Sequence, residues 1–248
     1  MIPLLAYGTA IMKPSDNDVF EKDISKEVNL ALSEAHFRHL DCAEGYTNEL
    51  SVGSALRDSR FKRKHIFVAT KCELGLSETW TLMEELQREG KTKSLGVSNC
   101  RIDDIEEILK NSKITPVVNQ IEIQPYVFDT AKPIIDYCHS KGIAIAGYAT
   151  LAPLTHFPGG PVCPVIKKRI AEELNATEDQ VLLKWAHQVT YGGVVVVSSR
   201  KKVRMQGFTK ALTEMKNLAE SQIKAISEAG LKKHQRAYGT RMDEGPSL

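Results

Sequence analysis

Short apolar runs alternate with longer amphipathic segments along the whole chain. The runs are rich in Val and Ile, and the run at residues 193–197 does not alternate apolar with polar positions. That pattern is typical of strands buried on both faces. We predict strands at residues 4–7, 37–40, 66–70, 94–97, 117–121, 143–147 and 194–197.

The segments between these runs repeat their apolar positions with helical spacing. They predict helices at residues 24–34, 49–58, 77–88, 102–111, 130–140, 165–174 and 177–188. Thr177, followed three residues later by Gln180, is a capping-box pattern for the last of these.

Alternating strands and helices indicate an α/β fold with a parallel sheet. No GxGxxG follows the first strand, which disfavours a Rossmann sheet. We therefore predict a (β/α)8 TIM-type barrel. A closed barrel of this kind has eight strands, and the pattern gives seven, so one strand is either absent or hidden in the pattern.

The length of 248 residues suits a single barrel domain over residues 1–248. From about residue 231 the chain holds Lys232, Lys233, Arg236 and Arg241 among Gly and Pro, without periodicity. We expect residues 231–248 to form a loose C-terminal tail, which could fold over the barrel mouth.

Composition and charge exclude several classes of function. With 33 basic and 31 acidic residues the net charge is +2, so no bulk field favours nucleic acid or a membrane. The five cysteines are scattered and lack metal-site spacing, which predicts reduced thiols and no metal site. No signal peptide or membrane span is visible, so we expect a soluble, cytoplasmic protein. The pattern does not indicate an oligomeric state.

The candidate chemistry lies just after the predicted strands. Asp41, Tyr46 and Lys71 follow the second and third strands, and further polar residues follow the later ones: Ser98, Asn99, Gln120, Tyr148, Ser198 and Ser199. In a parallel barrel these strand ends share one face, where barrel enzymes build their sites.

Asp41, Tyr46 and Lys71 together could make one tuned proton donor. A phenol is a poor acid at neutral pH unless a nearby cation stabilises the phenolate, and an aspartate could orient that cation. Such a donor suits protonation of a carbonyl oxygen as hydride arrives. A buried Asp–Lys ion pair beside a packing tyrosine explains the spacing equally well.

A set of ordered motifs resembles the aldo-keto reductase superfamily. The motifs are HLDCA and YTNE at residues 39–43 and 46–49, TK at 70–71, EGK at 89–91, GVSN at 96–99, NQIE at 119–122 and PY at 125–126. The stretch VVVSS at 195–199 is similar to the fungal branch that reduces α-keto amides and conjugated polyketones.

The resemblance implies a role for each matching residue. Tyr46 would be the catalytic acid, Lys71 the residue that lowers its pKa, and Asp41 their support. Ser98, Asn99 and Gln120 would hold the nicotinamide carboxamide, and the Tyr148 ring would stack on the nicotinamide. Ser98 and Asn99 could instead be helix caps, and Tyr148 could be a core residue.

The resemblance also implies NADPH (NADP+) as cofactor. Ser198, Ser199, Arg200 and Arg204 match the segment that reads the adenosine 2′-phosphate at a helix start, where anions bind well. Ser198 stands in place of the family's usual lysine. The alternative for the basic residues is a solvated helix start.

One part of the family pattern is missing. After the lysine strand these reductases carry a helix and a fourth strand that ends in a histidine, whereas here Lys71 is followed almost at once by the segment that resembles the next helix. None of the seven histidines replaces it by motif, although His156 could reach the barrel mouth. Three explanations compete: the sequence omits residues of the protein, the product is a shortened form, or the chain is a relic.

Two functions therefore stay open. The first is NADPH-dependent reduction of a small carbonyl compound, an aldehyde or ketone that could be an α-keto ester, an α-keto amide or a conjugated diketone. The second is a catalytically impaired NADP(H)-binding pseudoenzyme or regulatory subunit.

Overall fold

A single parallel sheet organises the molecule. The computed structural model describes residues 2–10, 19–72 and 76–239. Its strands follow the order β3-β2-β1-β7-β6-β5-β4. The strands are β1 Leu5–Gly8, β2 His39–Asp41, β3 Phe67–Ala69, β4 Val97–Ser98, β5 Val118–Glu122, β6 Ala144–Tyr148 and β7 Val194–Val197.

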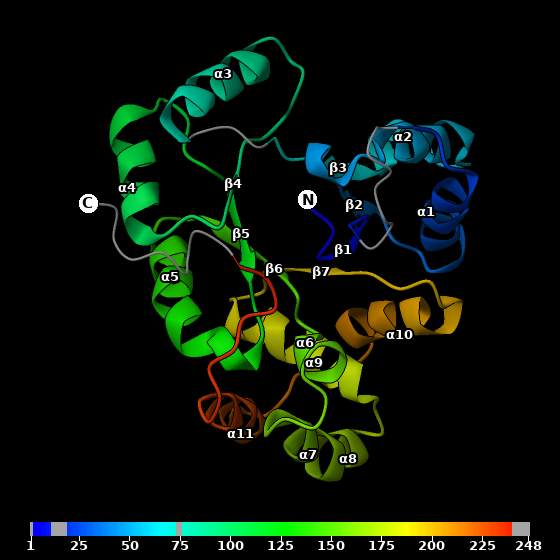
Figure 1. The fold of residues 1–248 in the computed structure, drawn as a ribbon, viewed down its shortest axis with the longest axis vertical. Coiled ribbons are helices and arrows are strands. Elements are labelled where there is room, and N and C mark those ends of the chain that lie inside the picture. The colour runs from blue at the N-terminus through cyan, green and yellow to red at the C-terminus, as the bar shows by residue number, and fades with distance from the viewer. Residues whose placement is uncertain (1, 11–18, 73–75, 240–248) are drawn as a thin grey trace.

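Helices connect successive strands and cover the outer face of the sheet (Figure 1). They are α1 Lys22–Glu34, α2 Glu49–Asp58, α3 Leu76–Arg88, α4 Ile102–Asn111, α5 Phe128–Ser140, α6 Ala152–Thr155, α7 Val162–Val165, α8 Glu172–Leu174, α9 Glu178–Val189, α10 Lys202–Thr213 and α11 Glu220–Gly230. Short 3-10 turns lie at η1 Glu44–Tyr46, η2 Arg63–His65 and η3 Pro125–Val127, and a π-helical segment, η4, spans Ile166–Ala171.

The side chains of β7 divide between two apolar clusters. Val195 and Val197 belong to the main core, whereas Val194 and Val196 join a small cluster with Ala6 and Ala146. Successive residues of a strand face opposite sides of a sheet. β7 is therefore buried on both faces, as its continuous apolar run predicted.

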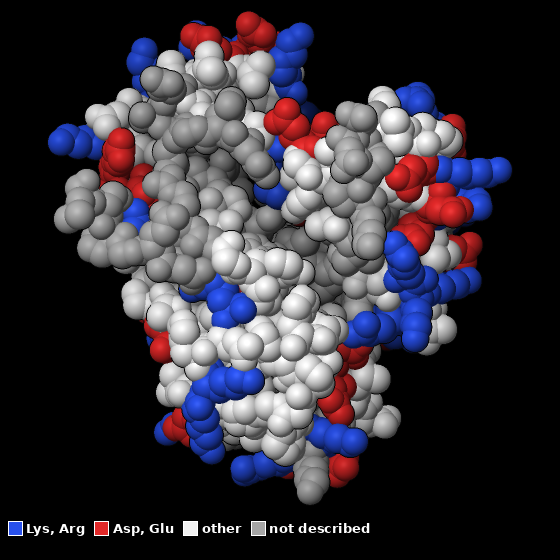
Figure 2. Space-filling view, viewed as in Figure 1, with Lys and Arg blue, Asp and Glu red and all other residues white. Residues whose placement is uncertain are grey.

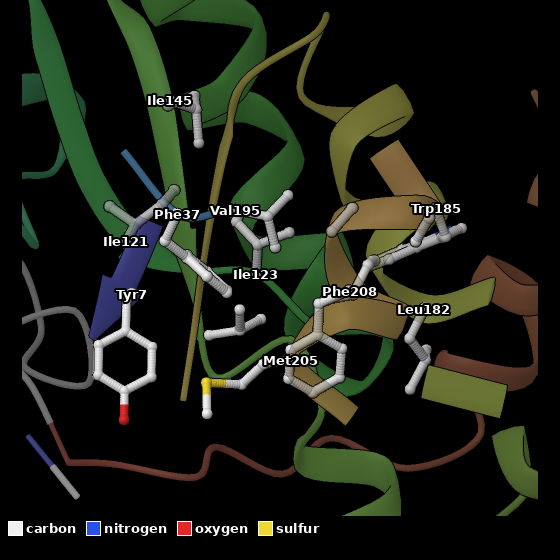
Figure 3. Close-up of a cluster of buried hydrophobic side chains, with 14 of the residues drawn as sticks. Tyr7, Phe37, Ile121, Ile123, Ile145, Leu182, Trp185, Val195, Met205 and Phe208 are labelled. Atoms are coloured by element: carbon white, nitrogen blue, oxygen red, sulfur yellow. The ribbon is translucent and has the colours of Figure 1, made fainter. Parts of the chain in front are cut away.

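The main core lies between the sheet and the helices. Figure 3 shows strand residues such as Ile121, Ile145 and Val195 together with Trp185 of α9 and Phe208 of α10. Trp185 and Phe208 are fully buried. The helices therefore pack on the outer face of the sheet, and the polar residues described below lie on its inner face.

The sheet curls but does not close. β2 and β5 are separated in the sheet by β1, β7 and β6, yet Gln120 Nε2 on β5 donates to Asp41 Oδ2 on β2 at 2.6 Å. The two side chains can meet only across the concave face of a curled sheet. β3 and β4 are the two ends of the strand order.

Helix α3, which follows β3 in the sequence, lies at the other end of the sheet, next to β4. Helix α3 packs with α4 and β4 through a separate cluster of Trp80, Leu95 and Ile108, and the Glu84 carboxylate accepts the backbone N–H groups of Lys113 and Ile114. Figure 1 shows α3 beside α4, apart from α2 and β3. Figure 2 shows the molecular surface hollowed between these two parts.

The predicted α/β barrel class is confirmed, and residues 2–10, 19–72 and 76–239 contain seven strands, as the pattern predicted. Each predicted strand has its counterpart, and the helices at 49–58 and 102–111 have the predicted bounds. The predicted helix at 165–174 is instead α7, η4 and α8 in succession, and α11 was not predicted.

Candidate active site

Lys71, just after β3, bonds to two groups at the end of β2. Its Nζ donates to Asp41 Oδ1 and to the Cys42 carbonyl oxygen, both at 2.7 Å. The Asp41 side chain is 4% exposed and that of Lys71 24%. An ammonium group has three protons to donate, and these two bonds use two of them.

Tyr46 lies beside this ion pair. It ends the 3-10 turn η1, which Glu44 joins to the end of β3 by donating its N–H to the Lys71 carbonyl at 2.9 Å. The ring centroid of Tyr46 lies 5.3 Å from Lys71 Nζ. The structure thus brings together the acid, the phenol and the amine that the sequence singled out.

Polar groups from the opposite wall complete the inner face. Gln120 bonds to Asp41 as described above, and Ser98 Oγ donates to the Gln120 carbonyl at 3.0 Å. Asn99, whose φ of 54° is left-handed, accepts the Tyr148 hydroxyl proton at 2.9 Å. The four residues come from the ends of β4, β5 and β6 and form one hydrogen-bonded wall.

The two serines after β7 bond in different directions, Ser198 to β1 and Ser199 to the N-cap residue of α10. Ser198 Oγ donates to the Gly8 carbonyl at 2.6 Å, and the Ser199 carbonyl accepts the Tyr7 hydroxyl at 3.2 Å. A Cβ atom at Gly8 would lie 2.9 Å from Ser198 Oγ, so glycine allows this close approach. Ser199 Oγ accepts the Lys201 N–H at 3.1 Å.

The basic residues around the start of α10 are held by carboxylates of neighbouring helices. Arg200 pairs with Glu27 at 3.1 Å, Lys202 with Glu34 at 2.6 Å, and Arg204 with Asp179 at 3.0 Å. Figure 2 shows Lys and Arg side chains gathered over α10 and α1. Arg200 and Lys202 remain exposed, so the cluster can still meet an anion.

Two residues near the site were not predicted. Glu122, at the end of β5, is completely buried, and the Tyr238 ring lies 6.2 Å from the Tyr148 ring. A charged residue between Ile121 and Ile123 in an apolar strand was the available signal for Glu122. Tyr238 gave no signal, because it lies in a segment without periodicity.

The histidines occupy separate places. His39 faces the barrel interior from β2, with Nδ1 3.1 Å from the Pro3 carbonyl oxygen. The His156 ring lies 5.5 Å from the Tyr238 ring. The predicted reach of His156 to the barrel mouth stays a prediction. The remaining five lie on other parts of the surface or in helix packing: His36, His65, His139, His187 and His234.

The described part of the chain also bears on metals and membranes. Within residues 2–10, 19–72 and 76–239, no three His, Cys, Asp or Glu side chains are grouped so as to hold a metal ion. No helix in the same part of the chain has both the length and the apolar character needed to cross a bilayer.

Known proteins share the sequence pattern and the fold of this chain. The profile of the Aldo/keto reductase family matches residues 4–77 and 73–156. The chain belongs to the aldo/keto reductase family. The two matched ranges overlap at residues 73–77, between β3 and β4 in the sequence, and these two strands are the ends of the strand order.

Individual relatives extend the comparison over the whole chain. An NAD/NADP-dependent indole-3-acetaldehyde reductase of Schizosaccharomyces pombe is 33% identical over 282 residues, covering 98% of this chain and 97% of the relative. An NADPH-dependent alpha-keto amide reductase of Saccharomyces cerevisiae is 26% identical, covering 93% and 87%. The first alignment is longer than the 248 residues of this chain, so it must contain gaps here.

A solved structure has the same fold. The crystal structure of the aldo/keto reductase from Brucella melitensis has a TM-score of 0.75 and 26% identity, covering 92% of this chain and 94% of its own. The predicted family and fold are confirmed. The family is one of carbonyl oxidoreductases, and relatives named for NADP or NADPH dependence support the predicted cofactor.

The residues present fit such a cofactor. No side chain caps the first turn of α10, so its N–H groups and the basic residues around it can serve a phosphate. The amides of Asn99 and Gln120 stand at strand ends beside the Tyr148 ring. These are donor and acceptor groups suited to a carboxamide, next to an aromatic surface suited to a flat ring.

Proposed function

We propose that this chain reduces an aldehyde or ketone to the alcohol with NADPH, with Tyr46 as the proton donor. The observation that carries the proposal is the ion pair of Asp41 and Lys71, which places an ammonium group 5.3 Å from the Tyr46 ring. The buried Asp41 carboxylate orients the ammonium group, and the Tyr46 ring lies beside that group.

The proton transfer follows from this geometry. As the carbonyl carbon is reduced, negative charge grows on its oxygen, and the Tyr46 hydroxyl donates a proton to it. The phenolate left on Tyr46 is stabilised by the Lys71 ammonium, because an adjacent cation favours the charged form of a phenol. Asp41 keeps Lys71 oriented, and Gln120 holds the other oxygen of Asp41.

The cofactor would lie across the barrel mouth from β4–β6 to the start of α10. When bound, NADPH supplies the hydride for the carbonyl carbon. Asn99, Gln120 and Ser98 would hold its carboxamide, and Tyr148 would present a ring face to the nicotinamide. Arg200, Arg204 and the residues Ser198 and Ser199 would form the phosphate end.

The finer proposal concerns the substrate. We propose one with a second polar group beside its carbonyl, such as an α-keto ester, an α-keto amide or a conjugated diketone. It is supported by the alpha-keto amide reductase among the relatives. The indole-3-acetaldehyde reductase supports an aldehyde with a flat aromatic group as well.

We also propose a cytoplasmic location, since all five cysteines are free thiols, as in a reducing compartment.

Replacement of Tyr46 by Phe tests the mechanism. Tyr46→Phe removes the proton and leaves the ring, so turnover of an α-keto ester should fall by roughly a hundredfold or more. The dissociation constant of NADPH, measured by fluorescence titration, should stay within about twofold of the original value.

Tyr191→Phe is the matched control. Tyr191 is exposed, and its hydroxyl bonds to Asp136 on the helical surface, so this variant should keep full activity. Full activity in Tyr46→Phe would refute the proposed donor.

The open sheet favours a second candidate, an NADP(H)-binding protein that does not turn over. β3 and β4 end the sheet without pairing to each other, and the family match breaks between them. Tight NADPH binding by the intact protein, without reduction of α-keto esters, diketones or aromatic aldehydes, would select this candidate. Measurable turnover that depends on Tyr46 would exclude it.

A further inference from the structure

Glu122 is a buried carboxylate that the proposed reaction does not use. It follows Gln120 on the inner face of β5 and lies opposite Tyr148 in the parallel register. Its side chain has no exposed surface, and this burial raises the pKa of the carboxyl group. A charged group in such a place needs compensating hydrogen bonds, and the structure shows where they come from.

The partners of Glu122 come from the C-terminal segment. Oε1 accepts the Ala237 N–H at 2.8 Å and a Gln124 amide proton at 3.1 Å. Oε2 accepts the Tyr238 N–H at 3.5 Å and lies 3.9 Å from Arg236 Nη1. The carboxylate therefore binds the backbone of Ala237 and Tyr238 and lies near the Arg236 guanidinium, more than one hundred residues away in sequence.

Further contacts hold the same segment, which we call the strap, residues 233–238. Gln235 donates its N–H to the Tyr126 carbonyl at 3.4 Å and accepts a Gln124 amide proton at 2.7 Å. The Lys233 ammonium lies over the Phe157 ring at 5.5 Å. The strap thus crosses the ends of β5 and η3 along a continuous set of bonds.

The strap ends in an aromatic contact with the candidate site. The Tyr238 ring lies 6.2 Å from that of Tyr148 and 5.5 Å from that of His156, both within the range of attractive ring pairs. Tyr238 still exposes 51% of its surface. One side of the ring is therefore available to a further apolar group next to Tyr148.

We propose that Glu122 is a positioning residue: its carboxylate binds the strap and holds the Tyr238 ring beside Tyr148, where it forms the aromatic wall for the flat side group of a carbonyl substrate. The role in catalysis rests on the proposed function above. The binding of the strap by Glu122 does not, and it can be tested without turnover.

Glu122→Gln is the discriminating substitution. It keeps the size of the side chain but replaces one oxygen by an amide nitrogen, which is a donor. Both carboxylate oxygens face donors, Ala237 and Gln124 on one side and Tyr238 and Arg236 on the other. Either orientation of the glutamine amide therefore places donor against donor, and the strap should come loose.

Hydrogen exchange followed by mass spectrometry measures the release of the strap. In the intact protein the amides of Gln235, Ala237 and Tyr238 should be protected. In Glu122→Gln their exchange should become roughly ten- to a hundredfold faster, since charge-assisted bonds are lost. Glu228→Gln makes the same change at a half-exposed carboxylate on α11 that pairs with Lys224, and it should leave the exchange unchanged.

Ala237→Pro covers the case in which Glu122→Gln does not fold. It removes one donor from the strap and leaves the barrel residues as they are, so the amides of Gln235 and Tyr238 should also exchange faster. Unchanged exchange of the strap in Glu122→Gln or in Ala237→Pro would overturn the proposal.

Steady-state kinetics test the aromatic wall. Tyr238→Ala should raise KM for 4-nitrobenzaldehyde roughly five- to tenfold, because a ring contact is lost, while KM for propanal and NADPH affinity stay unchanged. Tyr238→Phe keeps the ring and should restore the original KM. Equal KM in Tyr238→Ala and the original protein would refute the wall. If the protein reduces neither these aldehydes nor α-keto esters and diketones, the proposed function fails, but the exchange result still decides the binding of the strap.

Discussion

His39 is a buried residue inside the barrel that contributes to the pH dependence of the free energy of unfolding. Its ring is packed edge-on against Phe67, with centroids 4.6 Å apart, and Nδ1 donates to the Pro3 carbonyl. Nε2 is buried without a hydrogen-bond partner among the described residues. Burial lowers the pKa of His39, although the Pro3 bond and the charge of Asp41 partly oppose this and Lys71 adds to it.

The lowered pKa of His39 predicts a loss of stability in mild acid. Below about pH 6.5 the unfolded chain takes up a proton that the folded chain does not. The free energy of unfolding should therefore fall as the pH falls from 6.5 towards the folded-state pKa, with a slope of at most about 1.4 kcal/mol per pH unit from this residue.

Urea unfolding at several pH values between 5 and 8 measures this effect. His39→Gln cannot titrate, so its stability should depend less on pH in this window. His65→Gln, at an exposed position in η2, should behave as the original protein does. The same slope in His39→Gln and His65→Gln would contradict the assignment.

At the scale of residues, the sequence could place Asp41, Tyr46 and Lys71 because each follows a strand-like run closely. It could not place the bond from Gln120 to Asp41, which depends on how far the sheet curls. The partners of Glu122 were equally out of reach, since they lie in a segment without apolar periodicity. Contacts between residues that are distant in sequence can be predicted only once the fold is known.

Among the elements, the start of α10 has the most specific expected role, which is to bind the 2′-phosphate of NADPH. Arg204 lies in the first turn of this helix and is held by Asp179 of α9 at 3.0 Å. Asp179 also accepts the Thr177 hydroxyl and the Gln180 N–H at the start of α9. The arginine is therefore oriented before any anion binds, which reduces the entropy cost of binding.

Arg204→Ala should weaken NADPH much more than NADH. The arginine would pair with the 2′-phosphate, and the loss of such a charged hydrogen bond should raise the dissociation constant of NADPH roughly ten- to a hundredfold. NADH lacks that phosphate, so its affinity should change little. Fluorescence titration with both cofactors makes the comparison.

Lys210→Ala, an exposed position later in α10, is the control and should affect neither cofactor. An equal loss of affinity for NADPH and NADH in Arg204→Ala would show that the arginine acts on α10 and α9 rather than on the phosphate.

At the scale of elements, prediction succeeded where a segment carries its own signal. The helix at 102–111 has a regular apolar face, and β7 is an unbroken run of valines. The helix α11 was missed because its buried positions include the small residues Ala229 and Gly230. The π-helical turns of η4 could not be foreseen, since they arise from packing against α9 and α7.

The whole molecule is shaped by the open side of its sheet. Every residue of β3 and of β4 is only half-buried, whereas those of β7 are buried. Both edge strands are short, and the basic turn Arg63–His65 precedes β3. Short strands and nearby charge are common protections of exposed sheet edges. The barrel tolerates its opening, but two edges lack the backbone bonds that a closed barrel would give them.

Closing the barrel should stabilise the protein. A helix followed by a strand, inserted between Cys72 and Leu76, would supply a strand for both edges. Each kcal/mol of net stabilisation raises Tm by about 2–4 °C at this size, so a gain of about 2.5 kcal/mol should raise Tm by roughly 5–10 °C. A Gly/Ser insert of equal length is the control, because it adds the same loop without a strand to pair. If both inserts gave the same Tm in calorimetry, β3 and β4 would not be the free edges of an incomplete barrel.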